Sequence, residues 1–174
     1  MGRYFLGRNA KKVRRDRTYN NLDTAVTVGV IFDADRNADI EVVKQFVDSL
    51  IKDGKRVDVL GMVQLKEQVT LHNAGVGFSY FATEDCNFLC YPRSVAALQF
   101  ITQKYDILFN ICPQNNLCTD YIVGMSKARF KVSTQLGDQA YADFILQFST
   151  PAKGVGQIIG AIRQYLSNIA KAQA

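Results

Sequence analysis

Residues 25–50 read AVTVGVIFDADRNADIEVVKQFVDSL and decide the fold. The first eight, residues 25–32, are apolar apart from Thr27. A strand buried on both faces has this composition, whereas a half-exposed strand alternates apolar and polar residues. Gly29 inside the run predicts that another group packs closely against the strand.

The acidic loop after this strand leads into an amphipathic helix. Asn37 or Asp39 is expected to cap its first turn, and Gly54 to end it. Apolar side chains recur at helical spacing along one face, as in a helix packed on a sheet: Ile40, Val43, Phe46, Val47, Leu50 and Ile51.

The same alternation of strand and helix continues along the chain. Further strands are expected at residues 56–63, 78–81, 105–112, 130–134 and 143–148. Helices are expected after Pro92, at residues 117–128 and at residues 155–170; residues 64–76, which hold the single histidine, His72, show no clear pattern. The pattern predicts an α/β protein, a three-layer αβα sandwich around a mostly parallel Rossmann-like or flavodoxin-like sheet of about six strands.

The helix after Pro92 has a less decisive pattern. Val95, Leu98 and Ile101 are expected to face inward, with Phe100 as an option. These positions share one helical face, because residues three and four apart are neighbours on a helix.

Positive charge is concentrated at the amino terminus. Seven of the 21 Lys and Arg residues, and one of the 16 acidic residues, lie in residues 1–18; this segment therefore carries +6 and the remainder −1. We divide the chain into a basic N-terminal arm, residues 1–18, and a single α/β domain, residues 19–174. Interleaved with aromatic residues, the arm's cations can neutralise the phosphates of RNA or another polyanion: Arg3, Arg8, Lys11, Lys12, Arg14, Arg15 and Arg17. The alternatives are a solvated tail, or a first helix on the domain edge with its charges outward.

Other features bear on location. No apolar stretch approaches the roughly 20 residues of a membrane helix, and Tyr4-Phe5-Leu6 is too short for a secretory signal. Four cysteines without such a signal favour a reducing compartment, so we expect the cytoplasm. The Arg-rich, acid-poor arm also has the character of an organellar transit peptide.

Ligands of parallel sheets bind beyond the carboxyl ends of the strands. This rule selects a candidate ligand-binding set of Asp33, Asp35, Glu84, Asp85, Asn110, Lys153, Gly154 and Gly156. Asp33-Ala34-Asp35 is similar to the nucleophile and general acid of haloacid-dehalogenase-type phosphatases, so Asp33 and Asp35 are the catalytic candidates if the protein is an enzyme. The following Arg36-Asn37 departs from that family's pattern, and no acidic pair for magnesium follows. Strand-end acids commonly bind loop amides or cap the next helix instead.

Residues 149–160 combine a loop with a glycine-rich helix start, spaced G-x-G-x-x-x-G. Backbone N–H groups and Lys153 could hold a phosphate there. The spacing is one residue off the dinucleotide fingerprint and follows the last strand instead of the first. The alternative is that Gly156 and Gly160 let the helix lie close to the sheet.

The cysteines form two spaced pairs, Cys86 with Cys90 and Cys112 with Cys118. Four thiolates could hold zinc if the strands at residues 78–81 and 105–112 were adjacent. Neither spacing is the usual C-x2-C, so buried thiols are favoured and we assign no metal and no cofactor. There is also no P-loop, zinc-protease or kinase signature.

Several segments carry a family resemblance: Asn21-Leu22, Ile31-Phe32-Asp33-Ala34, Glu84-Asp85-Cys86-Asn87 before Pro92, and the runs at residues 105–110 and 126–132. With them the chain resembles an uncharacterised family of small bacterial proteins, typical of Bacteroidetes and known only as a domain of unknown function. Where that family has an aromatic residue and a glycine after the Asp-x-Asn of the loop, this chain has Phe88 and Leu89-Cys90. A weaker similarity relates residues 105–134 to the amino-terminal half of heptosyltransferase-type glycosyltransferases and implies a fold more than a reaction.

We therefore expect a non-catalytic binding or adaptor protein that holds an anionic partner, RNA or another polyanion, through its basic arm. The alternative is an enzyme acting on a phosphorylated or nucleotide-linked small molecule at the carboxyl edge of the sheet. A structural role as a homodimer is the third interpretation.

Overall fold

The computed structural model describes residues 2–71, 77–114, 116–134, 141–148 and 154–172. Its strands are β1 (Thr27–Asp33), β2 (Arg56–Val63), β3 (Phe78–Ala82), β4 (Ile107–Asn110), β5 (Phe130–Ser133) and β6 (Phe144–Ile145). All neighbouring strands are parallel, in the order β3-β2-β1-β4-β5-β6. This is the strand order of a Rossmann-like doubly wound sheet. The chain adds β2 and β3 on one side of β1 and then returns to add β4, β5 and β6 on the other side.

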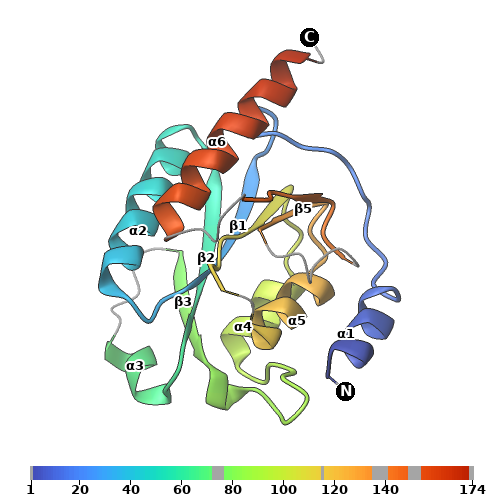
Figure 1. The fold of residues 1–174 in the computed structure, drawn as a ribbon, viewed down its shortest axis with the longest axis vertical. Helices are drawn as coiled ribbons and strands as arrows, with labels where there is room; N and C mark the ends of the chain where they lie inside the picture. Colours follow the sequence, from blue (N-terminus) through green and yellow to red (C-terminus); the bar gives the residue numbers. More distant parts are fainter. Residues whose placement is uncertain (1, 72–76, 115, 135–140, 149–153, 173–174) are drawn as a thin grey trace.

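Helices cover both faces of the sheet and complete the predicted three layers (Figure 1). Helices α2 (Asn37–Lys52) and α6 (Val155–Ala172) pack on one face. On the other lie α1 (Gly2–Ala10), α4 (Val95–Thr102) and α5 (Leu117–Met125). The short helix α3 (Lys66–Leu71) and a 3-10 turn, η1 (Thr83–Asp85), flank β3.

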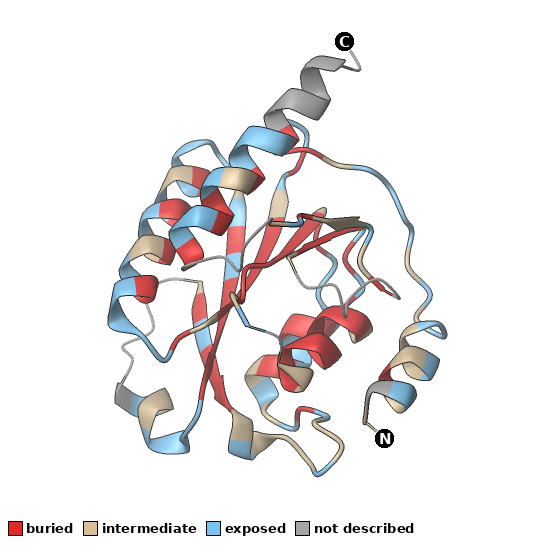
Figure 2. Cartoon of the chain, in the orientation of Figure 1, coloured by how far each residue is buried: buried red, intermediate tan, exposed pale blue. Residues whose placement is uncertain are grey.

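The central strand β1 is buried on both faces, as its apolar run predicts. Val28 and Val30 face the layer of α2 and α6, and Ile31 faces the opposite layer; all three are fully buried. Figure 2 shows the same division, with buried strands inside and exposed outer faces on the helices. The close approach predicted at Gly29 is confirmed, because a Cβ there would lie 2.8 Å from the Tyr105 ring.

Local predictions are wrong at two helices, α4 and α2. Val95 and Leu98 are 70% and 37% exposed, and α4 instead buries Ala97, Phe100 and Ile101. The N-cap residue of α2 is Arg36, which makes no side-chain capping hydrogen bond, and the helix begins at Asn37, so neither Asn37 nor Asp39 is its N-cap residue. The stretch of residues 64–76, which shows no sequence pattern, contains α3.

The basic arm begins as a packed helix. α1 lies against α5, and Leu6 is 2% exposed between them. The packing is close, since a Cβ at Gly124 of α5 would lie 2.7 Å from Leu6 Cδ1. Residues 2–10 therefore follow the interpretation of a first helix on the domain edge. No helix in the described part of the chain is long and apolar enough to cross a membrane.

Candidate functional site

The carboxyl edge of the sheet carries the candidate carboxylates. Asp33 ends β1, and its Oδ1 accepts the Asp35 N–H at 3.1 Å. Asp35 in turn accepts two hydrogen bonds from Gln64, from the backbone N–H at 3.1 Å and from Nε2 at 2.9 Å. These contacts tie the loop after β1 to the end of β2.

Asp33 has the most perturbed environment of these acids. Burial raises the pKa of its carboxyl, and the nearby Asp35 and Asp39 carboxylates raise it further, against the lowering effect of the Asp35 N–H. A half-buried acid with a raised pKa is a candidate proton donor.

Glu84 and Asp85 lie at the same edge beside the ends of β2 and β3. Glu84 accepts the Lys66 N–H at 3.1 Å. Asp85 accepts the Ala82 N–H at 3.0 Å and pairs with Lys66 Nζ at 3.1 Å. Both carboxylates therefore fix the start of α3 and the η1 turn.

The remaining candidates at this edge are of mixed character. Asn110 is fully buried: it accepts the Cys112 N–H and donates to Ser133 Oγ, both at 3.3 Å. A Cβ on Gly154 would lie 3.7 Å from Asp39 Oδ1, and one on Gly156 3.7 Å from Val42, which are ordinary contact distances. At Gly160 nothing lies within 4 Å, so the idea that this glycine allows close packing is wrong. Lys153 and His72 lie outside the described residues.

The condition for a site of four thiolates is not met, because β2 and β1 separate β3 from β4 and the two strands are not adjacent. Among the residues that the structure describes, no three His, Cys, Asp or Glu side chains are grouped so that they could hold a metal ion.

The amino edge of the sheet is organised by Asp106. Its Oδ2 accepts the N–H groups of Val26 and Thr27 at 3.0 and 2.9 Å, and the Thr27 hydroxyl at 3.0 Å. Its Oδ1 pairs with Arg129 at 3.3 Å. Burial acts to raise the pKa of Asp106, but the N–H donors of Thr27 and Val26 and the nearby Arg129 outweigh it and lower the pKa.

Residues 11–18 of the arm run along this edge, and Arg15 fastens them. The Arg15 guanidinium makes two hydrogen bonds to the Asp143 carboxylate, at 2.6 and 2.7 Å. It also donates to the carbonyls of Ala128 and Arg129, and its side chain is 4% exposed. Thr18 N–H adds a bond to the Arg129 carbonyl at 3.3 Å.

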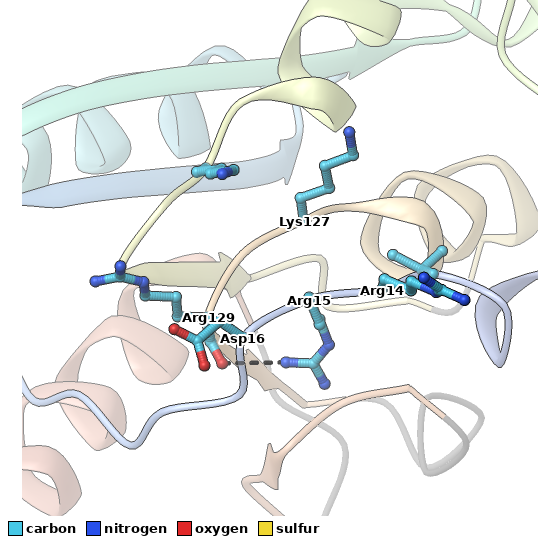
Figure 3. A pocket seen from close by; sticks show the side chains of 7 residues that line it. Arg14, Arg15, Asp16, Lys127 and Arg129 are labelled. Carbon is cyan, nitrogen blue, oxygen red and sulfur yellow. Dashed lines mark hydrogen bonds between the residues drawn. The ribbon is translucent and has the colours of Figure 1, made fainter.

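A cavity of about 470 Å³ opens between this fastened segment and the starts of β4 and β5. Five basic side chains and one acid are among its lining residues: Val13, Arg14, Arg15, Asp16, Lys104, Lys127 and Arg129. In Figure 3 Arg14, Lys127 and Arg129 extend from separate points around it, and the dashed bond joins Arg15 to the main chain of Arg129. We call Arg14, Lys104, Lys127 and Arg129 the basic cavity residues; all four are exposed.

The basic cavity residues carry more positive charge than the nearby acids neutralise. Asp143 neutralises Arg15, and Asp106 pairs with Arg129. Arg14, Lys104 and Lys127 have no ion-pair partner among the described residues. An anion would therefore meet three cations without an ion-pair partner, beside the single exposed carboxylate of Asp16.

The seven cations selected from the arm separate into different roles. Arg15 is structural and Arg14 lines the cavity. Arg17 is exposed at 3.9 Å from Asp143, and Arg8 lies over the Phe5 ring. Lys11 and Lys12 are exposed, and the side chain of Arg3 lies outside the described part. Lys104, Lys127 and Arg129 were not selected from the sequence, because only the order of the strands brings them beside the arm.

The fold is that of a doubly wound α/β protein with a basic cavity at its amino edge. The chain belongs to DUF6913, a family of unknown function whose model matches residues 1–169. Searches of curated proteins and of solved structures give no match.

Proposed function

We propose that the protein binds an anionic partner, RNA or another polyanion, in the basic cavity at the amino edge of its sheet. The observation that carries this function is the group of four exposed cations around one cavity, three of them without an acidic partner in the described chain. Exposed cations at this density bind phosphate groups by releasing counterions, which makes the affinity strongly dependent on salt.

The adjacent Tyr19 favours RNA within this class. Its ring contacts Phe130 edge-on, with centroids 5.1 Å apart, and remains 38% exposed. Tyr19 follows Thr18, which is bonded to the cavity residue Arg129. An exposed aromatic ring beside a basic groove can stack an unpaired base.

Substitution of the three unpaired cations tests the proposal. Arg14→Ala, Lys104→Ala and Lys127→Ala together should weaken binding of a fluorescent oligouridylate roughly a hundredfold, at about 1 kcal/mol per lost contact. The slope of log K against log salt should fall by about 2, as expected for three lost phosphate contacts. Fluorescence anisotropy across a salt series measures both quantities.

The matched control removes the same charge elsewhere. Lys52→Ala, Arg56→Ala and Arg93→Ala are exposed positions outside the cavity and should leave affinity within about threefold. Equal losses in the two triple variants would show that net charge, not the cavity, causes binding, and would overturn the proposal. Point variants are preferable to deletion of residues 1–18, because deletion would also remove the buried Leu6 and the Arg15 contacts.

Tyr19→Ala distinguishes RNA from a polyanion without bases. Loss of one stacked base, worth about 1–3 kcal/mol, should weaken oligouridylate binding and leave inorganic polyphosphate binding unchanged. An equal effect on both ligands would leave the cavity as a general polyanion site.

The raised pKa of Asp33 favours a second candidate, an enzyme acting on a phosphorylated or nucleotide-linked small molecule at the carboxyl edge. Under this hypothesis wild-type protein turns over p-nitrophenyl phosphate, and Asp33→Asn abolishes turnover while the circular dichroism spectrum stays native and the urea midpoint does not fall. Asp48→Asn, on the exposed side of α2, is the matched control and should retain full turnover. Absence of turnover in the wild type removes this candidate. A cytoplasmic location and a homodimer stay predictions.

A further inference from the structure

Three of the four cysteines gather on the face of the molecule that carries α4 and α5. Cys118 is the second residue of α5 and is 5% exposed. Cys86 and Cys90 lie in the loop after η1, are half-buried, and pack against the same apolar cluster that contains Cys118. Cys112, two residues after the end of β4, is buried and does not belong to this apolar cluster.

Contacts on either side of Cys90 place its loop along the first turns of α5. The rings of Tyr91 and Tyr121 meet edge-on, with centroids 6.0 Å apart. A Cβ on Gly2 would touch both Leu117 and the carbonyl of Leu89, so these two residues are also neighbours. Cys90 lies between Leu89 and Tyr91, and Cys118 between Leu117 and Tyr121. The residues before and after Cys90 therefore lie beside residues of α5 on either side of Cys118, which places the two cysteines close to each other.

The loop is held in a conformation that an ordinary residue avoids. Asn87 Oδ1 accepts the N–H groups of Leu89 and Tyr91, both at 2.9 Å. Cys90 has φ of 61°, the one positive φ of a non-glycine residue in the described chain. Strained residues of this kind persist where surrounding contacts fix them, and they often mark functional positions.

The protonation of these thiols reflects their proximity. Hydrogen bonding with the Cys86 thiol, followed by burial, raises the pKa of Cys118 far above its usual value. Burial, followed by the proximity of Cys118, raises the pKa of Cys90 to about 11. A hydrogen bond with the Cys90 thiol acts to lower the pKa of Cys118, but the net shift at both Cys90 and Cys118 disfavours the thiolate. A disulfide is easily reduced when the protein stabilises the thiolates of its reduced form. Where the protein does not stabilise them, a disulfide persists once it has formed.

We propose that Cys118 is a cross-linking site that forms a disulfide with Cys86 or Cys90 and thereby fastens the loop after η1 to α5. This inference is independent of anion binding, because it concerns another face and other residues. The oxidant is a low-molecular-weight disulfide. One cysteine thiolate attacks it, forms a mixed disulfide and releases one thiol; the second cysteine then attacks the protein sulfur of the mixed disulfide and releases the other thiol. The protein loses two electrons and two protons, and the reagent disulfide gains both.

Peptide mapping of the full-length protein tests the proposal. The reduced protein is incubated with oxidised glutathione at mildly alkaline pH, residual thiols are blocked while it is still folded, and it is digested without reductant. We expect a linked peptide pair that joins Cys118 to Cys86 or to Cys90, together with a rise in the urea midpoint that reductant reverses.

Matched variants separate this pairing from general thiol reactivity. Cys118→Ala should abolish both the linked pair and the rise in the midpoint, whereas Cys112→Ala should retain both. If Cys118→Ala folds poorly, Cys86→Ala with Cys90→Ala removes both partners from the loop and should have the same effect on cross-linking. Absence of a linked pair in the wild type, a Cys86–Cys90 link, or a link through Cys112 or between two chains would overturn the proposal.

Discussion

Asp33 and Asp106 lie at opposite edges of one parallel sheet, and their carboxyl pKa values shift in opposite directions. Asp106 accepts two backbone N–H groups and a hydroxyl and pairs with Arg129, so its ionised form is stabilised. Asp33 is half-buried, accepts only one backbone N–H and has two acidic neighbours, so its ionised form is disfavoured. Both acids bind loop amides, yet the environment of only one compensates its charge.

The two edges of the sheet therefore differ in their balance of charge. At the amino edge Asp106 and Asp143 form ion pairs that hold the strands and the arm together. The cations around the cavity outnumber the acids there. At the carboxyl edge the described acids mostly anchor backbone, and Asp33 is left with a cost of ionisation. A polyanion is attracted to the first edge; the second offers at most a proton donor.

The largest effect should come from breaking the attachment of the arm. Arg15→Ala removes the bidentate contact with the Asp143 carboxylate and the hydrogen bonds donated to the carbonyls of Ala128 and Arg129. Breaking a largely buried ion pair costs about 3 kcal/mol, so the free energy of unfolding should fall by that amount in urea titrations. Anion affinity should fall as well, because the cavity loses one wall.

Arg17→Ala is the control for this prediction. Arg17 is 68% exposed and lies 3.9 Å from the same carboxylate, so the free energy of unfolding should change by less than about 0.5 kcal/mol. Similar losses in both variants would mean that Arg15 contributes only as a surface charge.

Asp106→Asn should have the next largest effect. An amide retains shape but loses the charge that attracts Arg129 and strengthens the three bonds to Val26 and Thr27; we expect a loss of about 2 kcal/mol at neutral pH. The pKa of Asp106 is lower in the folded than in the unfolded protein. Its stabilising contribution is therefore complete above the unfolded value, near pH 4, and disappears as the pH falls through the folded value.

The measurement is the urea midpoint as a function of pH for wild type and variant. The gap between them should narrow as the pH falls below about 4. A constant gap across the acid range would show that Asp106 stabilises the fold through shape alone.

The sequence predicts the sheet well because its central strands are largely buried on both faces. Residues 56–63 are an uninterrupted strand signal, and β2 has those bounds. α4 has a more ambiguous pattern, since Val95 and Leu98 lie on one face and Ala97, Phe100 and Ile101 on another. Both faces contain large apolar residues, and only the position of the helix over the sheet decides between them.

The basic cavity is harder to predict for a topological reason. Arg14, Lys104 and Lys127 are far apart along the chain. They meet because β4 and β5 begin side by side and residues 11–18 cross both starts. Charge counting identifies the basic arm but not its partners, since strand order cannot be read from local composition. The run Ser126-Lys127-Ala128-Arg129 at a strand start is the sequence signal that could have indicated them.

The smallest effect, and the one of opposite sign, should come from Asp33→Asn. Because burial raises the pKa of Asp33, ionisation costs the folded protein free energy that it does not cost the unfolded one. This cost grows as the pH rises from the unfolded pKa to the folded one and is constant above. Asparagine removes this cost while its Oδ1 can still accept the Asp35 N–H, so at neutral pH the variant should be more stable than wild type by less than about 1 kcal/mol.

Urea titrations at acid and neutral pH measure the difference in stability, which should vanish at the acid end. A variant less stable than wild type at neutral pH would show that the Asp33 carboxylate is needed as a charged acceptor, and the contrast between the two edges of the sheet would no longer hold.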